Sequence, residues 1–413
     1  MLEDFFSFLK NSPTSHHAKE EVEKRLLDKG YIKLDLKSSW DLEEDKGYFV
    51  TSGSFITAFY LPKTVNRISL VASHTDSPAL KIKPNAVVEY KRVCKLNTDI
   101  YGGPIFSTWA NRDLGIAGKV IYKKNGLQSC LVNIVDHPVM VCQPAIHVHR
   151  KINEEGMNAE HLKPVLSLNK DAKIEDLLKT QLDFDEIVDF DLFLYPLQQA
   201  RTIGLDHSLI SAYRLDNLAS SYSSLIALLE AKHSDSLNVC IFFDHEEIGS
   251  QTYEGASFTL VDQILEKIIK DREKLFALKQ DSLCLSCDLS HGFEPDYKEK
   301  FDKENTPHLD DGVVIKYDTK KNYVTSIEGA AIIQTIANEN NIPLQKFHNK
   351  SNARSGSTIG PIFEASHGIK TVDIGISCLS MHATKEVISV KDFTEQTKLL
   401  KNFYEKTYNL ANL

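Results

Sequence analysis

Short apolar runs that alternate with helical segments constrain the fold of this chain more than any other feature. Apolar, strand-like runs lie at residues 68–72, 237–243, 283–288 and 370–376. Helical spacing of apolar residues is found at residues 218–232, 258–275, 325–341 and 390–410. Apolar strands between helices indicate a sheet that is buried on both faces and mainly parallel. We therefore predict an α/β fold with a mainly parallel central sheet flanked by helices.

A β-rich segment interrupts this pattern. Residues 1–30 have helical spacing with a break at Ser12-Pro13-Thr14-Ser15, and residues 48–61 are β-rich. After about residue 86 the chain consists of short β-rich pieces between turn residues, at residues 118–122, 130–135 and 139–149. We predict a discontinuous α/β domain over residues 1–85 and 206–413. The predicted insertion is a β-rich domain over residues 86–205.

Composition narrows the class of protein. The formal net charge of −9 argues against general affinity for nucleic acid or for anionic membranes, because both require a basic surface. The N-terminus carries Glu3 and Asp4 where a secretory signal would carry bases, and no run approaches the ~18 apolar residues of a spanning helix. Seven cysteines in 413 residues do not resemble a disulfide framework. We expect a soluble protein of the reducing cytoplasm.

Side chains that bind metals follow several of the predicted strands. These residues are His74 and Asp76 after residues 68–72, Glu246 and Glu247 after residues 237–243, Asp288 at the end of residues 283–288, His382 after residues 370–376, and Asp216 just before a helix. In open α/β sheets, sites form beyond the carboxyl ends of the strands. We therefore expect these side chains to converge on one site.

The residue types at this predicted site suit metal-dependent hydrolysis. Two histidines and three carboxylates can hold two borderline divalent ions such as Zn²⁺, and such ligands also accept Co or Mn. In the adjacent pair Glu246-Glu247, one side chain can bind metal while the other acts as a general base on the attacking water. The spacing of His74 and Asp76 lets Asp76 orient the imidazole if the backbone is extended.

Several longer motifs carry a resemblance to a known family. They are, in order, SHTDSPALKIKP, YGGPIFSTWANRDLGIAG, PAIHVHR, YRLDNLAS, FDHEEIGSQT, CDLSHGFEPDY, GSTIGPI and SMHATKE. Together these motifs resemble the aspartyl aminopeptidase and vacuolar aminopeptidase I family of dinuclear zinc aminopeptidases, over nearly the whole chain. The resemblance implies an enzyme that removes N-terminal residues, preferably Asp or Glu, from peptide substrates.

The resemblance also implies roles for individual residues. One metal ion would be held by His74, Asp216 and Asp288. The other would be held by Asp216, Glu247 and His382, so that Asp216 bridges the two ions. Glu246 would be the general base.

Substrate recognition and assembly are further implications of the resemblance. Lys316 would receive an acidic substrate side chain, with Tyr323 nearby, and His147 of the insertion would reach the active site of a neighbouring subunit. The insertion would be a dimerisation domain, and the homo-oligomer would be a dodecamer built from dimers. One departure concerns Asn352, which stands where relatives usually carry Asp, so the charge of its loop differs.

Alternative interpretations remain open at this point. The same ligands could serve a dinuclear deacylase or carboxypeptidase, or a self-assembling scaffold with structural metals. His147 and His149 would share one face of a strand and could bind one metal. The pattern better fits two ordinary surface histidines, or one histidine that assists a neighbouring site. The CxxC spacing of Cys284 and Cys287 lies in a strand-like run without a second pair, which favours structural cysteines. Gly249 occupies the position where an HExxH motif would need its second histidine.

Overall fold

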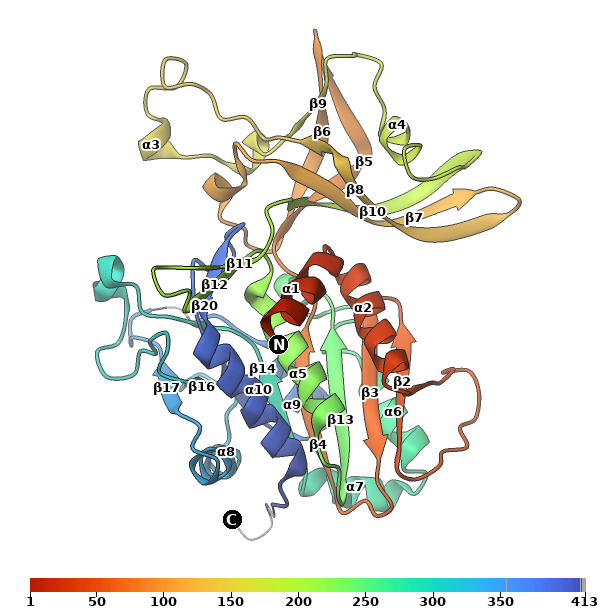
Figure 1. The fold of residues 1–413 in the computed structure, drawn as a ribbon, viewed down its shortest axis with the longest axis vertical. Coiled ribbons are helices and arrows are strands. Elements are labelled where there is room, and N and C mark those ends of the chain that lie inside the picture. The colour runs from red at the N-terminus through yellow and green to blue at the C-terminus, as the bar shows by residue number, and fades with distance from the viewer. Residues whose placement is uncertain (354, 409, 411–413) are drawn as a thin grey trace.

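The computed structural model describes residues 1–353, 355–408 and 410. The chain forms a large α/β body and a smaller β-rich body that projects from it (Figure 1). Both the N-terminal helices and the C-terminal helix lie in the α/β body, on either side of the inserted segment in the sequence (Figure 1). No helix among the described residues has the length and hydrophobicity that crossing a membrane requires.

The α/β body is built on a nine-stranded sheet in which parallel pairs predominate. The three central strands are buried along nearly their whole length, as expected for a sheet covered on both faces. In spatial order the strands are β1 (Ile32–Lys33), β2 (Lys46–Ser52), β3 (Phe55–Leu61), β13 (Ser236–Phe243), β4 (Arg67–His74), β14 (Leu283–Cys287), β18 (Lys370–Gly375), β16 (Val313–Tyr317) and β17 (Leu344–His348). The predicted α/β fold with a mainly parallel sheet is confirmed.

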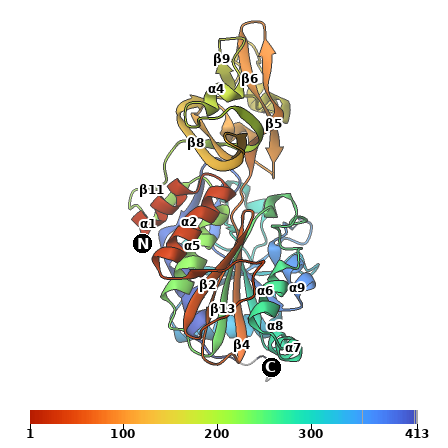
Figure 2. The same cartoon turned by 90° about the vertical axis from the view of Figure 1, so that its right-hand side faces the viewer.

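Helices cover both faces of this sheet, and each face has its own hydrophobic core (Figure 2). The first core contains residues of α1 (Leu2–Asn11), α2 (Ser15–Asp28), α5 (Leu215–Glu230), α8 (Ile327–Glu339) and α10 (Val390–Glu405). The second core contains residues of α6 (Leu260–Ile268), α7 (Arg272–Gln280) and α9 (Ile359–His367). The predicted break between the first two helices is present, and the Thr14 side chain caps α2 by accepting from the His17 N–H.

The projecting body contains a six-stranded antiparallel sheet with its own core. Its strands, in spatial order, are β8 (Leu127–Val139), β7 (Leu114–Lys123), β10 (Glu186–Pro196), β5 (Ala79–Tyr90), β6 (Val93–Tyr101) and β9 (Val165–Ser167). The short helical segments around it are η1 (Phe106–Trp109), α3 (Ile152–Glu155), η2 (Ala159–His161) and α4 (Ile174–Leu178).

A third, five-stranded sheet lies between the two bodies (Figure 1). Its strands, in spatial order, are β11 (Arg201–Ile203), β12 (Leu209–Ala212), β20 (Glu386–Ser389), β19 (Ser377–Leu379) and β15 (Ser290–His291). Two short 3₁₀ helices, η3 (Glu246–Ile248) and η4 (Pro295–Lys300), follow β13 and β15. This sheet connects the chain just before Asp216 with the strands on either side of His382.

Three expected elements differ from the structure. The single helix expected over residues 258–275 is two helices, because the Asp271 side chain accepts from the Glu273 and Lys274 N–H groups and starts a new helix there. The strand expected over residues 139–149 is wrong: β8 ends at Val139, and only isolated bridges at Met140 and Val141 follow. The helix expected over residues 390–410 ends at Glu405, and residue 409 lies outside the described residues.

Loss of the strand over residues 139–149 also removes the geometric basis for a metal site at His147 and His149. Pro144 has no backbone N–H to donate to a neighbouring strand. Turns follow it, in which the Val148 and His149 N–H groups both donate to the Ala145 carbonyl. The two histidines therefore do not alternate along a strand, and the shared face on which that interpretation depended is absent.

Candidate metal centre

The carboxyl ends of the central strands place four of the predicted residues at one edge of the sheet. β4 runs parallel to β13 on one side and to β14 on the other, and His74 is in register with Phe243. Glu246 and Glu247 follow β13 in η3, and Asp288 follows β14 directly. Because these strands are parallel, the residues that follow them meet at the same edge.

Asp216 and His382 reach the same edge from irregular backbone. Asp216 has non-helical dihedral angles near the start of α5, after Arg214 in the left-handed region at φ 65°. His382 also has a positive φ, of 67°, in the loop between β19 and β20. Conformations of this kind cost free energy and occur where the surrounding structure holds them, often at functional sites.

The donor atoms form two triads that share Asp216. His74 Nε2 lies 3.6 Å from Asp216 Oδ1 and 3.5 Å from Asp288 Oδ1. On the other side, His382 Nε2 lies 3.5 Å from Asp216 Oδ2 and 3.5 Å from Glu247 Oε2. In each triad one donor atom per residue lies within 4.8 Å of the other two. His74, Glu246 and Glu247 form a third such group.

Two buried oxygens show that these residues fit metal ions. Among the described residues, neither Asp216 Oδ1 nor Glu247 Oε1 has a hydrogen-bond partner, although both are shielded from solvent. A buried carboxylate oxygen without a partner is costly. Asp216 Oδ1 lies beside His74 Nε2 at 3.6 Å, and a cation between the two atoms would supply its partner. The mixture of imidazole and carboxylate donors is typical of zinc sites.

Asp76 connects the two sides of the centre through hydrogen bonds. His74 Nδ1 lies 3.1 Å from the Asp76 carbonyl oxygen and 3.3 Å from its Oδ1, which leaves Nε2 facing the donor groups. The Asp76 carboxylate also accepts from the Glu246 N–H at 3.1 Å and the Glu247 N–H at 3.0 Å. Tyr101 of the inserted sheet donates to the same carboxylate at 2.8 Å.

His382 is held by groups that the sequence did not indicate. Its Nδ1 lies 3.1 Å from the Gly103 carbonyl oxygen, and its own carbonyl accepts from the Ile105 N–H at 3.1 Å. Its N–H donates to Glu386 Oε1 at 2.7 Å, and Glu386 Oε2 accepts from the Asp216 N–H at 2.9 Å. Only the position of these residues in the motifs YGGPIF and SMHATKE could have drawn attention to them.

Charges at the centre shift the pKa values of its side chains strongly. Burial, together with Asp288, Asp76 and Asp216, raises the pKa of Glu246 to about 8, although His74 opposes the shift. Burial and the Asp216 carboxylate raise the pKa of Glu247 as well. Burial lowers the pKa of His382, but Asp216 and Glu386 outweigh it and raise the value to about 9. A cluster of negative charge this dense is suited to cations.

A cavity of about 270 Å³ opens beside the donor groups, and two of the predicted substrate residues line it. Lys316 is 2% exposed, and its Nζ donates to the Leu289 carbonyl at 2.7 Å and lies 3.9 Å from Asp288 Oδ2. The same ammonium lies 5.4 Å from the ring centroid of Tyr323.

The other two residues singled out by the resemblance lie elsewhere. His147 is exposed in the projecting body and does not line this cavity of its own chain. Asn352 is exposed in the loop that leads to the cavity-lining residues Gly356 and Ser357.

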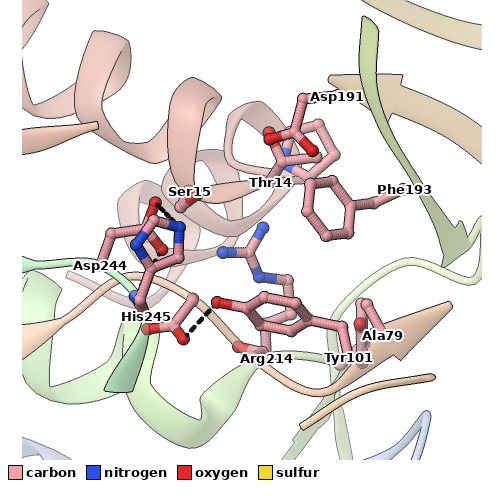
Figure 3. Close-up of a pocket in the computed structure, with 13 residues that line it drawn as sticks. Thr14, Ser15, Ala79, Tyr101, Asp191, Phe193, Arg214, Asp244 and His245 are labelled. Atoms are coloured by element: carbon pink, nitrogen blue, oxygen red, sulfur yellow. Dashed lines mark hydrogen bonds and ion pairs between the residues drawn. The ribbon is translucent and has the colours of Figure 1, made fainter. Parts of the chain in front are cut away.

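A second, smaller cavity, which Asp76 also lines, lies among residues of both bodies and of the segment between the N-terminal helices (Figure 3). The Arg214 guanidinium points into it beside Tyr101 and donates to the Ser12 carbonyl at 2.6 Å and to the Thr75 carbonyl. Arg214 thereby connects the segment before α2 with the backbone between His74 and Asp76. Arg214 therefore helps to hold the backbone that carries His74 and Asp76.

Comparisons with known proteins show which family this chain resembles. The sequence model described as "Aminopeptidase I zinc metalloprotease (M18)" matches residues 8–404. A curated protein of Clostridium novyi (strain NT), named "Probable M18 family aminopeptidase 2", is 35% identical over 423 residues, which cover 97% of this chain and 98% of that protein.

Solved structures also resemble this chain. Ape4, solved by cryo-electron microscopy in a complex with Nbr1, has a TM-score of 0.91 and 30% identity over 97% of this chain and 85% of that one. The dodecamer of S. cerevisiae mApe1 has a TM-score of 0.85 and 25% identity over 97% of this chain and 95% of that one.

Proposed function

Since the chain belongs to the aminopeptidase I zinc metalloprotease (M18) family, we propose that it removes N-terminal residues from peptides with a dinuclear metal centre in which Asp216 is shared. Family membership makes the chain a metallo-aminopeptidase and a peptide hydrolase, with zinc as the metal of the family. It disfavours the alternatives of a deacylase, a carboxypeptidase or a scaffold. The observation that carries the proposal is the pair of triads that share Asp216.

In this proposal five side chains hold the metal ions. One ion is held by His74, Asp216 and Asp288, and the other by Asp216, Glu247 and His382. Bound divalent ions supply Lewis acidity to the scissile carbonyl and to the attacking water. The protein supplies the position of each ligand: Asp76 orients His74, and the Gly103 carbonyl orients His382.

Glu246 is the proposed general base. Glu246 belongs to neither of the two triads that share Asp216. It lies at the same edge of the central sheet, with its Oε2 3.9 Å from His74 Nε2. Asp76 accepts from the Glu246 backbone N–H and so fixes the start of η3. The carboxylate takes a proton from the attacking water and then delivers it to the amine that leaves.

The wall of the cavity supports a preference for acidic N-terminal residues. Lys316 is the lysine that lines the cavity, beside Asp288, and its one hydrogen bond among the described residues goes to the Leu289 carbonyl. The remaining donors can bind the carboxylate of an Asp or Glu side chain. Tyr323 packs against the ammonium and limits the size of that side chain.

We also propose that the chain works as a homo-oligomer. A related structure is a dodecamer, and this chain aligns with it over 97% of its length, including the projecting body. In this assembly the predicted insertion, residues 86–205, forms dimer contacts. His147 is exposed on the insertion and is then able to enter the active site of a neighbouring subunit.

Replacement of Glu246 by Gln tests the mechanism. Glu246→Gln should retain two metal ions per chain but lose about 100- to 10,000-fold in kcat, because the amide cannot accept the proton. Glu247→Gln is the matched comparison, and it should lose metal as well as activity. Metal analysis and steady-state kinetics measure both outcomes. Wild-type kcat in Glu246→Gln would disprove the assignment of the base.

Replacement of Lys316 tests the substrate preference. Peptides that begin with Asp, Glu, Leu or Ala are compared at saturating metal. The wild type should favour Asp and Glu, and Lys316→Met should lose that preference while still cleaving neutral residues. Lys346→Met removes an exposed lysine from the neighbouring strand β17 and should leave the preference unchanged. An acidic preference that survives in Lys316→Met would rule out this pocket.

A further inference from the structure

The Glu386 carboxylate joins two metal-ligating segments that are distant in sequence. Its Oε2 accepts from the Asp216 N–H at 2.9 Å, and its Oε1 accepts from the His382 N–H at 2.7 Å. Both oxygens therefore hold the backbone of residues whose side chains belong to the same triad. Glu386 itself is not part of any group of donor atoms found at the centre.

The third sheet places Glu386 between these segments. Glu386 is the first residue of β20 and pairs with Ala212, the last residue of β12. His382 lies four residues before Glu386, and Asp216 lies four residues after Ala212. The two segments leave the sheet side by side, with the Glu386 side chain between them.

The environment of Glu386 is unfavourable for a carboxylate, because the side chain is buried and has no cation beside it among the described residues. Glu386 is 1% exposed, and no ion pair among the described residues includes it. Burial of a carboxylate without a cation is costly, and hydrogen bonds to backbone N–H groups offset only part of that cost. A neutral residue of similar size would avoid the cost but would not hold both N–H groups.

The backbone around both N–H groups needs such a constraint. Arg214 and His382 have φ values of 65° and 67°, and Asp216 has non-helical dihedral angles within α5. Among the described residues, Glu386 is the acceptor found for the N–H of Asp216 and for the N–H of His382. Without it, both loops would be free to relax to conformations of lower energy.

We infer that Glu386 is a positioning residue that fixes the separation of Asp216 and His382 and thereby sets the affinity for the ion held by Asp216, Glu247 and His382. This role rests on the dinuclear centre proposed above. The ion held by His74, Asp216 and Asp288 depends less on Glu386, because β4 and β14 of the central sheet fix His74 and Asp288.

Two substitutions of Glu386 distinguish the effect of its two hydrogen bonds from the effect of its negative charge. In Glu386→Gln the amide oxygen can still accept one N–H, but the amide NH₂ group faces the other and cannot accept it. In Glu386→Asp the charge is kept, but the shorter side chain cannot reach both N–H groups. Both variants should weaken metal binding if position is what matters, and Glu386→Asp serves as the second test if Glu386→Gln does not fold.

Asp392 offers a matched control. It is fully buried, and its carboxylate accepts from the Asp310 and Gly312 N–H groups, each at 2.8 Å. It thus makes the same kind of double contact as Glu386, but to a loop that holds none of the proposed ligands. Asp392→Asn should lower the melting temperature and leave metal binding unchanged.

The test measures zinc retention by the full-length protein. Zinc-loaded wild type, Glu386→Gln, Glu386→Asp and Asp392→Asn are dialysed against graded chelator, and metal per chain is measured at each step. The wild type should hold two ions, and both Glu386 variants should release one of them at an affinity about 10- to 100-fold weaker. Visible spectra of the Co²⁺-loaded proteins should change in the Glu386 variants and stay unchanged in Asp392→Asn.

The outcomes that overturn the inference are distinct from those that overturn the proposed function. Wild-type affinity for both ions in Glu386→Gln would disprove the positioning role. An equal loss of metal in Asp392→Asn would show a general loss of stability instead. A wild type that binds a single ion would disprove the dinuclear centre, whatever the variants do.

Discussion

At the scale of single residues, Asp76 contacts three residues of the proposed metal centre without being a proposed ligand itself. Its carboxylate is buried and accepts from Tyr101 and from the backbone of Glu246 and Glu247, and it lies beside His74 Nδ1. One residue thus orients a ligand, the proposed base and the start of η3.

Asp76→Asn should lower kcat about 10- to 100-fold and raise KM little. The amide oxygen can replace one acceptor, but the amide NH₂ group would face an N–H of η3 and turn Glu246 away from its position. Steady-state kinetics with an N-terminal substrate measure the effect. Asp244→Asn removes a neighbouring buried carboxylate that, among the described residues, contacts the N–H and the ring of His245 and none of the proposed ligands, so it should have a smaller effect. Equal kinetics in the wild type and Asp76→Asn would contradict this role.

Away from the metal centre, the lowered pKa of His233 should make the free energy of unfolding depend on pH. Its ring stacks on Tyr60 with centroids 3.7 Å apart, and burial lowers its pKa to about 4. Between pH 6.5 and about 4 the unfolded chain binds a proton at His233 that the folded chain does not, so the contribution of His233 to the free energy of unfolding should fall as the pH falls. One group contributes at most ~1.4 kcal/mol per pH unit.

The prediction is checked by denaturant unfolding of the wild type and of His233→Gln at several pH values in this window. The variant should show a shallower dependence on pH, because it has no group to protonate at this position. Parallel curves for the two proteins would show that His233 does not contribute.

At the scale of elements, the segment around η1 ties the projecting body to the metal centre. Besides the contacts of Gly103 and Ile105 with His382, Thr108 binds the next part of the loop twice. Thr108 Oγ1 accepts from the Thr384 N–H at 3.1 Å, and the Thr108 carbonyl accepts from Thr384 Oγ1 at 2.8 Å. His382, a proposed ligand on the α/β body, is therefore held by the chain between β6 and β7.

Thr108→Val should lower kcat/KM about fivefold without unfolding the protein. Valine keeps the shape but removes the acceptor for the Thr384 N–H, and one such hydrogen bond contributes about 1 kcal/mol. Thr108→Ser keeps the hydroxyl and should restore activity. A loss of activity that is as large in the serine variant would mean that the methyl group, not the hydrogen bond, is responsible.

At the scale of the whole molecule, metal removal should destabilise the fold. Glu246, Glu247, Asp216 and Asp288 converge from different strands and loops, and their negative charges repel one another without cations. Ions that bind only the folded state add about 2.7 kcal/mol at 100 times their Kd. Chelator should therefore lower the melting temperature by several degrees, and zinc should restore it.

The pH dependence of the metal-free protein follows from the same charges. The pKa values of Glu246 and Glu386 are raised to about 8, so the folded metal-free chain binds more protons than the unfolded chain between about pH 8 and 4.5. Its stability should increase as the pH falls through this window, and the effect of chelator should shrink. Thermal unfolding with and without chelator at pH 8 and pH 6 measures this. A chelator effect of equal size at both pH values would contradict it.

Much of the architecture could be predicted because its signals are local. Apolar runs such as residues 237–243 indicated buried strands, and the polar residues after them indicated where ligands would gather. The break before α2 and the mainly parallel sheet followed from capping residues and from alternation of strands with helices. Local signals failed where a single residue decided the outcome, as at the Asp271 cap and at Pro144.

The sequence by itself determined most of the elements and placed polar residues at the ends of strands that share one edge of the sheet, because apolar periodicity and polar strand ends are properties of neighbouring residues. Only the tertiary structure decided how these side chains are held. The hydrogen bonds of Glu386 to Asp216 and of Gly103 to His382 join residues 170 and 279 positions apart. Such contacts depend on how loops pack across the sheets, and no local pattern of residues encodes that packing.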